Sequence, residues 1–291
     1  MTPRVSTIYK TTGSPATTYT STDGSNWTAA AGAKLPNGGF DWSVVKMGPN
    51  NYRMYFASMM NKAESVSCAT KMKSLFYATP TDLLTWSAQP GSLVEDVGCS
   101  VPHVLRRQDG TFFLYYNTLS SELTVMKIAS SQDRPSFALV GVSNDCNHGD
   151  SAPLVMPDGT YLMISAAVCK TTQTGQISNS PKGIDWTRRS GALLTLSNAA
   201  VVDPSVELVN GKLRVWLAYA AGGGHDKAVI VTGALTLGSA AAATTTTATA
   251  TIPSSWSSGA TSKITCVKRK ITKKLVATKC PAGFNKKQMC S

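Results

Sequence analysis

A unit of about 50 residues recurs along this chain, and this repeat limits the possible folds more than any other feature of the sequence. Each copy opens with a short apolar stretch, passes through a turn that contains Gly or Asn, and continues into an aromatic-rich stretch. The openings are Asp41–Val45, Cys99–Val104, Asp150–Val155 and Asp203–Val206. About 50 residues is the length of a four-stranded propeller blade, and such blades stack because none buries its apolar faces alone. The sequence therefore predicts an all-β protein built as a β-propeller.

Composition and turn chemistry agree with this class. The chain is 42% hydrophobic, enough for a sizeable core, and only 15% charged, which disfavours helices rich in Glu and Lys. Asp109-Gly110, Asp158-Gly159 and Asn210-Gly211 separate the first and second strands of three copies. A tight hairpin needs such residues because Gly tolerates a positive φ. The predicted second strands are Tyr52–Ala57, Phe112–Tyr116, Tyr161–Ser165 and Leu213–Tyr219.

A second motif places an aromatic residue four positions after an Asp. The copies are Asp23 to Trp27, Asp82 to Trp86 and Asp133 to Phe137, while a fourth has Lys182 before Trp186. We interpret this motif as structural, because the Asp accepts backbone hydrogen bonds in a turn and the aromatic ring packs between blades.

The number of blades depends on the N-terminal segment. The first aromatic turn precedes the first opening, so Val5–Thr28 supplies outer strands to a blade that lacks them. There are four blades if this segment completes the blade opened at Asp203, and five if it forms most of its own blade with Val229–Leu237. Five is favoured, because Val229–Leu237 is otherwise surplus.

The composition divides the chain into a propeller (residues 1–238), a disordered Thr/Ala/Ser-rich linker (239–262) and a small basic Cys-containing tail (263–291). From Lys263 onward there are nine basic residues and no acidic one, so the net charge of +12 belongs mainly to the tail. The tail resembles short C-terminal segments of exported actinobacterial proteins, in which Cys-Val-Lys precedes Cys-Pro-Ala-Gly. That resemblance implies attachment to an anionic cell envelope, and a disordered tail without a partner is the alternative.

The seven cysteines contain no CxxC pair, and the histidines complete no zinc-ligand spacing, so neither a metal nor a cofactor is expected. Disulfides would indicate an oxidising compartment and a secreted or cell-surface protein, whereas seven separate buried thiols would fit the cytosol. Met1–Arg4 lacks the apolar core of a signal peptide. The sequence has no apolar run of about 18 residues, so no membrane span is predicted. Nucleic-acid binding is disfavoured because the basic tail has no stacking platform, and a monomer is expected.

In a propeller, the residues that begin the inner strands gather around one mouth of the central channel. Asp41, Asp150 and Asp203 come from three openings and are therefore the candidate catalytic residues, with Cys99 in the corresponding place of the second blade. The alternative is purely structural. Because Asp forms turns well, the three carboxylates could simply accept backbone hydrogen bonds at the strand starts.

Three further residues near the openings are candidate sugar-binding residues: Trp42, His103 and His148. The Trp42 ring could stack on a pyranose, although strand alternation points it between blades. The two histidines could equally be ordinary surface or packed side chains.

Residues 18–238 resemble the five-bladed propellers of glycoside hydrolase families 43 and 32. Asp41, within Phe40–Val45, matches the family's base or nucleophile, and Asp150, within Gly149–Pro153, matches its second aspartate. The resemblance implies hydrolysis of a glycosidic bond between an acid and a base. Asp203 departs from the pattern, because family 43 has Glu there as the proton donor.

Other donors and other functions remain open. Glu207 is about 13 Å further along the strand, and Glu95 or Asp96 could donate from the approach to the second blade. A non-catalytic glycan- or protein-binding propeller is one alternative. A sialidase-like enzyme is another, since Ser21–Trp27 approximates an Asp box, but no Arg stands at a blade opening to bind a carboxylate.

Overall fold

The computed structural model describes residues 6–10, 17–23, 26–36, 39–49, 51–58, 72–80, 82–97, 100–120, 123–132, 137–143, 149–167, 174–191, 193–195, 199–221, 229–236, 263–268, 271–276 and 285–286. All regular structure in these ranges is β-strand or turn, and every pair of named strands is antiparallel. The chain divides into two compact units, residues 1–248 and 249–291. The all-β prediction is therefore confirmed.

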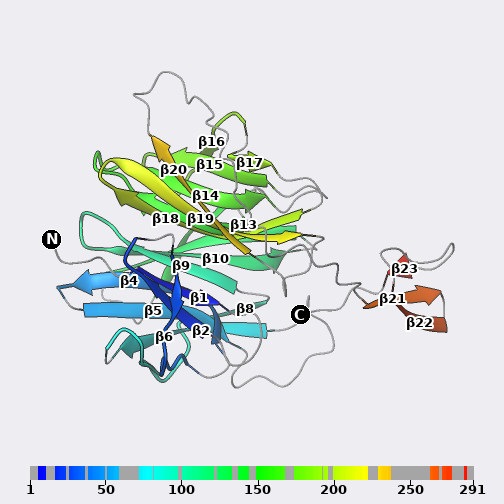
Figure 1. Ribbon diagram of the computed structural model, residues 1–291. Coiled ribbons are helices and arrows are strands. Elements are labelled where there is room, and N and C mark those ends of the chain that lie inside the picture. The colour runs from blue at the N-terminus through cyan, green and yellow to red at the C-terminus, as the bar shows by residue number, and fades with distance from the viewer. Residues whose placement is uncertain are drawn as a thin grey trace. The chain divides into compact units, whose positions relative to one another are not determined.

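Four sheets of the first unit begin at the four predicted openings and succeed one another from blue to yellow in Figure 1. The first contains β4 (Gly39–Gly48), β5 (Asn51–Ser58), β6 (Met72–Pro80) and β7 (Trp86–Ala88), with β8 (Val94–Val97) also paired to β6. The second contains β9 (Ser100–Arg106), β10 (Phe112–Ser120), β11 (Leu123–Ser131) and β12 (Ala138–Ser143). The third contains β13 (Gly149–Val155), β14 (Tyr161–Ala167), β15 (Thr174–Ser180) and β16 (Thr187–Arg188), with β17 (Leu194–Thr195) on β15. The fourth contains β18 (Ala199–Val209), β19 (Lys212–Ala221) and β20 (Val229–Thr236).

The inner strands of these sheets are neighbours, because β4 contacts β9, β9 contacts β13, and β13 contacts β18. This is the arrangement of successive propeller blades. The predicted propeller is confirmed.

The N-terminal segment forms a separate sheet of β1 (Ser6–Lys10), β2 (Thr17–Ser21) and β3 (Thr28–Ala29). The Asp23 turn joins β2 to β3 as the Asp82 turn joins β6 to β7, so these strands correspond to the second, third and fourth strands of a blade. Arg214 on β19 donates to the Asp23 backbone oxygen at 2.7 Å, which links this sheet to the fourth blade. The expectation that Val229–Leu237 joins the N-terminal strands was wrong, because β20 pairs with β19 along its whole length.

The core consists of apolar clusters between adjacent blades. Alternate side chains of β10 point to opposite neighbours: Leu114 and Tyr116 pack against the first blade, whereas Phe113 and Tyr115 pack against the third. Likewise, β14 divides its side chains between the second and fourth blades. Each second strand is thus buried on both faces, which explains why its sequence is a continuous apolar run rather than an alternation.

Two of the aromatic turns pack as predicted, between neighbouring blades, whereas Trp86 packs in a cluster with Phe56 and Phe76 of its own blade. Phe137 of the second blade lies edge-on to Tyr55 of the first, with ring centroids 6.2 Å apart. Trp186 of the third blade lies 6.0 Å from Tyr115 of the second. The Tyr115 hydroxyl donates to the Gly183 backbone oxygen at 2.8 Å, and this glycine has a positive φ of 78° and no room for a Cβ.

Turn capping also follows the prediction. Asp82 accepts from the backbone N–H groups of Leu84 and Thr85, and Asp23 accepts from that of Asn26. Where Lys182 replaces the Asp, the Ser180 hydroxyl accepts from two backbone N–H groups instead. Asp133 lies outside the described residues.

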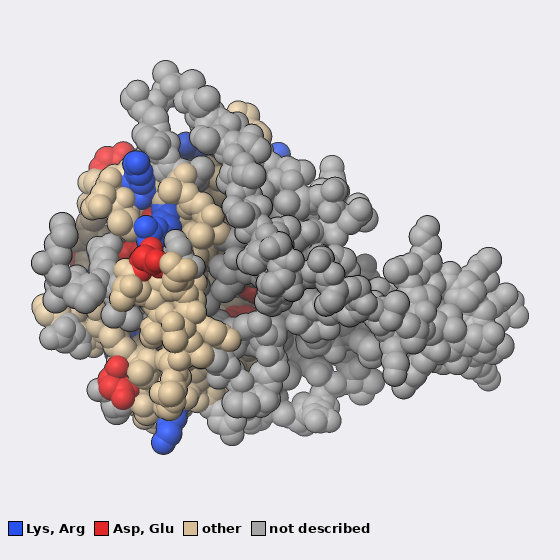
Figure 2. All heavy atoms as spheres, in the orientation of Figure 1, with Lys and Arg blue, Asp and Glu red and all other residues tan. Residues whose placement is uncertain are grey.

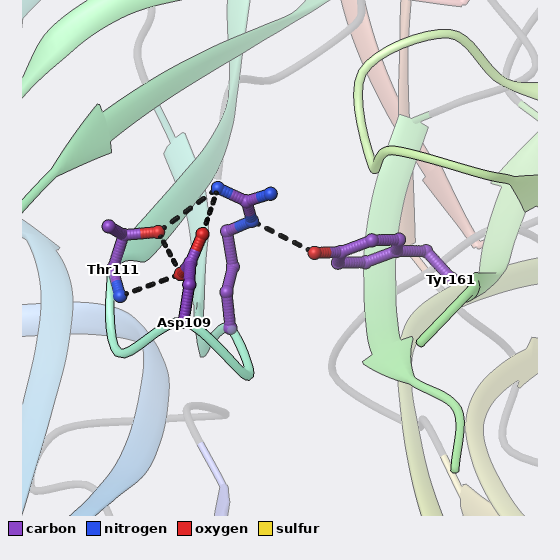
Figure 3. A network of polar contacts seen from close by, with 4 residues as sticks. Asp109, Thr111 and Tyr161 are labelled. Carbon is purple, nitrogen blue, oxygen red and sulfur yellow. Dashed lines mark hydrogen bonds and ion pairs between the residues drawn. The ribbon is translucent and has the colours of Figure 1, made fainter. Parts of the chain in front are cut away.

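The hairpin after β9 carries a polar network that joins the second blade to the third (Figure 3). Arg107 donates through Nε to the Tyr161 hydroxyl at 2.9 Å and pairs with Asp109 at 2.9 Å. Its guanidinium also lies 4.6 Å from the centre of the Phe113 ring. The hydrogen bond to Tyr161 raises the pKa of Arg107, so the cation persists at every working pH. One arginine therefore connects both blades.

We expect Arg107→Ala to lower the free energy of unfolding by about 1–2 kcal/mol, because it removes a cross-blade hydrogen bond and a cation–π contact. Urea denaturation checks this value. Asp158→Ala is the control. Asp158 accepts hydrogen bonds from Thr160 just as Asp109 accepts them from Thr111, but it has no described arginine partner. Equal unfolding midpoints for wild type and Arg107→Ala would contradict the interpretation.

The second unit contains a small sheet of β21 (Lys263–Lys268), β22 (Ile271–Val276) and β23 (Asn285–Lys286), in the order β22-β21-β23. Part of the basic tail is thus a folded sheet rather than a disordered segment. The predicted linker, residues 239–262, lies outside the described residues, as do all cysteine side chains. Within the described ranges, no helix has the length and hydropathy to cross a membrane.

Candidate active site

Each of the four inner strands is interrupted near its start by a β-bulge. The pairing register shifts between Phe40 and Ser43 on β4 and between Val202 and Ser205 on β18. The pairing of β9 with β10 shifts where β9 faces Tyr115–Asn117, and the pairing of β13 with β14 shifts between Gly149 and Ser151. A bulge re-aims the side chain that it carries, and bulges are common next to active sites. The same distortion therefore recurs at the same place in every blade.

Every one of these bulges contains a residue with positive φ. The angles are 53° at Asp41, 49° at Val101, 33° at Asp150 and 49° at Asp203. Aspartate enters this left-handed region comparatively easily, whereas a β-branched residue there is a genuine outlier. A residue held in such a conformation costs roughly 1–3 kcal/mol, and such residues cluster at functional sites.

The bulges correct one expectation from the sequence. Cys99 was expected at the position in the second blade that corresponds to Asp41, but the structure places Val101 there, two residues later. The sequence signal was present, because Val101-Pro-His-Val and Asp203-Pro-Ser-Val align without a gap.

Asp203 lies within electrostatic range of the other two bulge aspartates, Asp41 and Asp150. Loss of hydration is the largest cause that raises the pKa of Asp203 well above its usual range, and the charges of Asp150 and Asp41 raise it further. The Asp203 side chain nevertheless keeps an exposed surface, while Asp41 and Asp150 are half-buried. Among the described residues, no three His, Cys, Asp or Glu side chains are grouped closely enough to hold a metal ion.

Asp41 is also tied to the neighbouring blade. Its Oδ2 accepts a hydrogen bond from the backbone N–H of Val101 at 3.1 Å. Two residues further along β4, the buried Ser43 hydroxyl accepts from the backbone N–H of Val104 at 3.3 Å. A hydrogen bond from a peptide N–H favours the ionised form of a carboxyl group. Asp41 and Asp203 thus differ in their surroundings: a peptide N–H donates to Asp41, whereas loss of hydration and neighbouring charges raise the pKa of Asp203.

The candidate sugar-binding residues are placed differently from one another. Trp42 packs in an apolar cluster with Phe56 and Trp86 of the first blade, as strand alternation indicates. His103 lies on β9, two residues after Val101, and loss of hydration lowers its pKa to about 4. The His103 imidazole is thus half-buried and neutral near the bulge of the second blade, and its role in sugar binding stays a prediction. His148 lies outside the described residues.

The alternative proton donors lie on other parts of the strands than the bulges. Glu207 lies on β18 opposite Arg214, on the far side of Ser205 from Asp203. Glu95 and Asp96 belong to β8, which pairs with the outer edge of β6. Their backbone is thus three strand spacings, about 14 Å, from β4.

Comparisons with known proteins agree on the fold. No family model matches the chain, and no curated protein matches it in sequence. A thermostable family-43 glycoside hydrolase superposes with a TM-score of 0.60 at 15% identity, over 75% of this chain and 81% of that one. An exo-1,5-alpha-L-arabinanase from a bovine ruminal metagenomic library gives 0.54 at 13%, over 78% and 88%. A family 117 glycoside hydrolase from Zobellia galactanivorans gives 0.52 at 12%, over 69% and 72%.

This fold is the propeller of glycoside hydrolases. The predicted resemblance to family 43 is confirmed at the level of structure, and at these identities the likeness concerns the fold alone. On the face in Figure 2, the described Lys and Arg side chains are interspersed with Asp and Glu.

The raised pKa of Asp203 predicts a pH-dependent stability. The folded state binds the Asp203 proton more tightly than the unfolded state, whose pKa is near 3.8, so this group favours folding at low pH. That contribution is lost as the pH rises from about 4 through the folded-state pKa. Asp203→Asn should therefore stabilise the protein near neutral pH and flatten this part of the curve. Urea midpoints at several pH values test this, and an unchanged dependence would contradict it.

Proposed function

We propose that this protein is a glycoside hydrolase whose catalytic carboxyl groups are Asp41, Asp150 and Asp203. The observation that supports this most strongly is the mutual influence of the three carboxylates, which come from three blades. Glycoside hydrolysis needs one protonated and one ionised carboxyl group on either side of the scissile bond. The fold of the structural neighbours is compatible with this chemistry, since they are propeller glycoside hydrolases.

Asp203 is the proposed proton donor, and Asp41 is the proposed base or nucleophile. As the bond from the anomeric carbon to the leaving oxygen breaks, the Asp203 proton moves to that oxygen. The anomeric carbon is attacked either by water that Asp41 deprotonates or by Asp41 itself, and water then completes hydrolysis. Asp150 keeps the pKa of Asp203 raised through its negative charge. Asp203 is one methylene shorter than Glu, so the substrate must approach the bulge closely.

The charge of the cluster points to a neutral sugar. A uronic or sialic acid would place its carboxylate beside three aspartates, and like charges repel at short range. None of the described residues at the four blade openings is Lys or Arg. This composition favours neutral oligo- or polysaccharides over the sialidase alternative, which requires a cation for the substrate carboxylate.

Replacing the proposed base or acid should strongly slow turnover. We expect Asp41→Asn and Asp203→Asn each to lower kcat on glycosides with unactivated leaving groups by roughly 10²–10⁴-fold, the usual contribution of acid–base catalysis. Initial rates on a panel of neutral glycosides provide the measurement. Asp158→Asn is the control, since Asp158 caps an exposed hairpin turn. Full activity of Asp41→Asn would exclude the proposed roles.

The main alternative is a propeller that binds glycans without cleaving them. The hydrogen bond from Val101 to Asp41 favours it, because a carboxylate engaged with a backbone amide also serves a structural purpose. Calorimetric binding of a neutral oligosaccharide, without any reducing sugar released over a day, would support this alternative.

We further propose that the protein is secreted or held at the cell surface, with its tail attached to an anionic envelope polymer. The strand pairing of the tail brings together lysines that are distant in sequence. Lys273 on β22 and Lys286 on β23 both pair with Cys266 on the central strand β21. The tail has nine basic residues and no acidic ones. Such an array attracts polyanions in a salt-dependent manner.

Binding of the full chain to immobilised polygalacturonate or polyphosphate should fall steeply as NaCl rises from 50 mM to 500 mM. Replacing Lys273, Lys274 and Lys286 by Gln should weaken binding at low salt, while glycosidase activity stays unchanged. Retention that is insensitive to salt would exclude an electrostatic attachment.

A further inference from the structure

We propose that Val101 is a positioning residue of the acidic cluster: its backbone N–H holds the Asp41 carboxylate, and its uncharged side chain keeps the second blade's bulge free of negative charge. This inference rests on the proposed function for its catalytic consequence. The effect of Val101 on the aspartates themselves can be measured by NMR titration, without any enzymatic activity.

The geometry assigns this role to Val101 in two steps. First, the four bulge residues all have a positive φ, between 33° and 53°, at corresponding places of their inner strands. Three of the four are aspartates, of which Asp41 and Asp150 act on the charge of Asp203, and Val101 is the neutral member. Second, Val101 is the residue whose N–H reaches the neighbouring carboxylate, at 3.1 Å from Asp41 Oδ2.

The strain at Val101 supports a role beyond packing. Asn, Asp or Gly would occupy the left-handed region with far less strain than a β-branched residue. Aspartate stands at the three other bulges, so a small change of sequence would relieve the strain here. It would also add a fourth carboxylate beside Asp41. A neutral side chain at this position therefore limits the number of like charges that the mouth must accommodate.

Other titratable groups lie close enough to be considered. His103, two residues along β9, has a pKa of about 4 and is neutral at the pH values of interest. Asp150 is already part of the cluster. Among the described side chains, the remaining ionisable ones on β4, β18 and the strands packed against them are Lys46, Tyr52, Arg53, Tyr55, Arg106, Tyr161, Glu207, Lys212 and Arg214. All the charged ones lie several residues along their strands from the bulges.

The pair Val101→Asp and Val101→Asn tests the charge. Both side chains tolerate positive φ and have the same shape, so only the charge differs between the variants. With ¹³C-labelled aspartate carboxyl groups, we expect Asp203 to titrate at higher pH in Val101→Asp than in Val101→Asn. The pH–activity profile should move in the same direction, because an added negative charge disfavours ionisation of both catalytic groups. Identical Asp203 titrations in the two variants would overturn the proposal.

The backbone contact has its own test. The amide resonance of Val101 should shift as Asp41 titrates in the wild type, and this shift should disappear in Asp41→Asn. An amide that does not respond to pH would contradict the assigned contact. If no glycoside is hydrolysed by the wild type, the proposed function fails, whereas both NMR outcomes still decide whether Val101 organises the cluster.

Discussion

The structure depends on second strands that are apolar on both faces. Leu114 and Tyr116 need one neighbouring blade and Phe113 and Tyr115 need the other, so no blade can bury its surface without two partners. Radial stacking is the consequence, and it brings the inner strands β4, β9, β13 and β18 side by side. The clustering of Asp41, Asp150 and Asp203 thus results from apolar burial elsewhere in the blades. Hydrophobic packing offsets the electrostatic cost of grouping like charges.

The features that sequence predicted well are local. The Asp-Gly hairpins and the aromatic turns each depend on a few adjacent residues whose turn chemistry is visible in the sequence. In the third blade, Lys182 replaces the Asp of the aromatic turn, and Ser180 supplies the hydrogen-bond acceptor instead. The turn therefore forms although the motif is incomplete. The convergence of three aspartates was also predictable, because it follows from the repeat period and from propeller geometry.

The features that sequence missed depend on pairing and backbone conformation. The sequence does not reveal a left-handed bulge residue at Val101, because β-branched residues rarely adopt positive φ, and it indicates Cys99 instead. The position of β20 is not predictable because its composition would suit either the N-terminal sheet or the fourth blade. Its pairing with β19 places it in the fourth blade. Nothing in a single sequence reports the hydrogen bond between Val101 and Asp41, which joins residues 60 positions apart.

The bulges also bear on why aspartate occurs three times. If the backbone alone required Asp at each bulge, the second blade could not carry a valine in the same conformation. Val101 shows that the fold forms this bulge without a carboxylate. A backbone requirement by itself therefore does not account for the three aspartates, and the charges of Asp41 and Asp150, together with the loss of hydration at Asp203, oppose ionisation of Asp203 in the folded state. This electrostatic cost, at a bulge where the fold also accepts a neutral residue, is an argument for the catalytic role proposed for them.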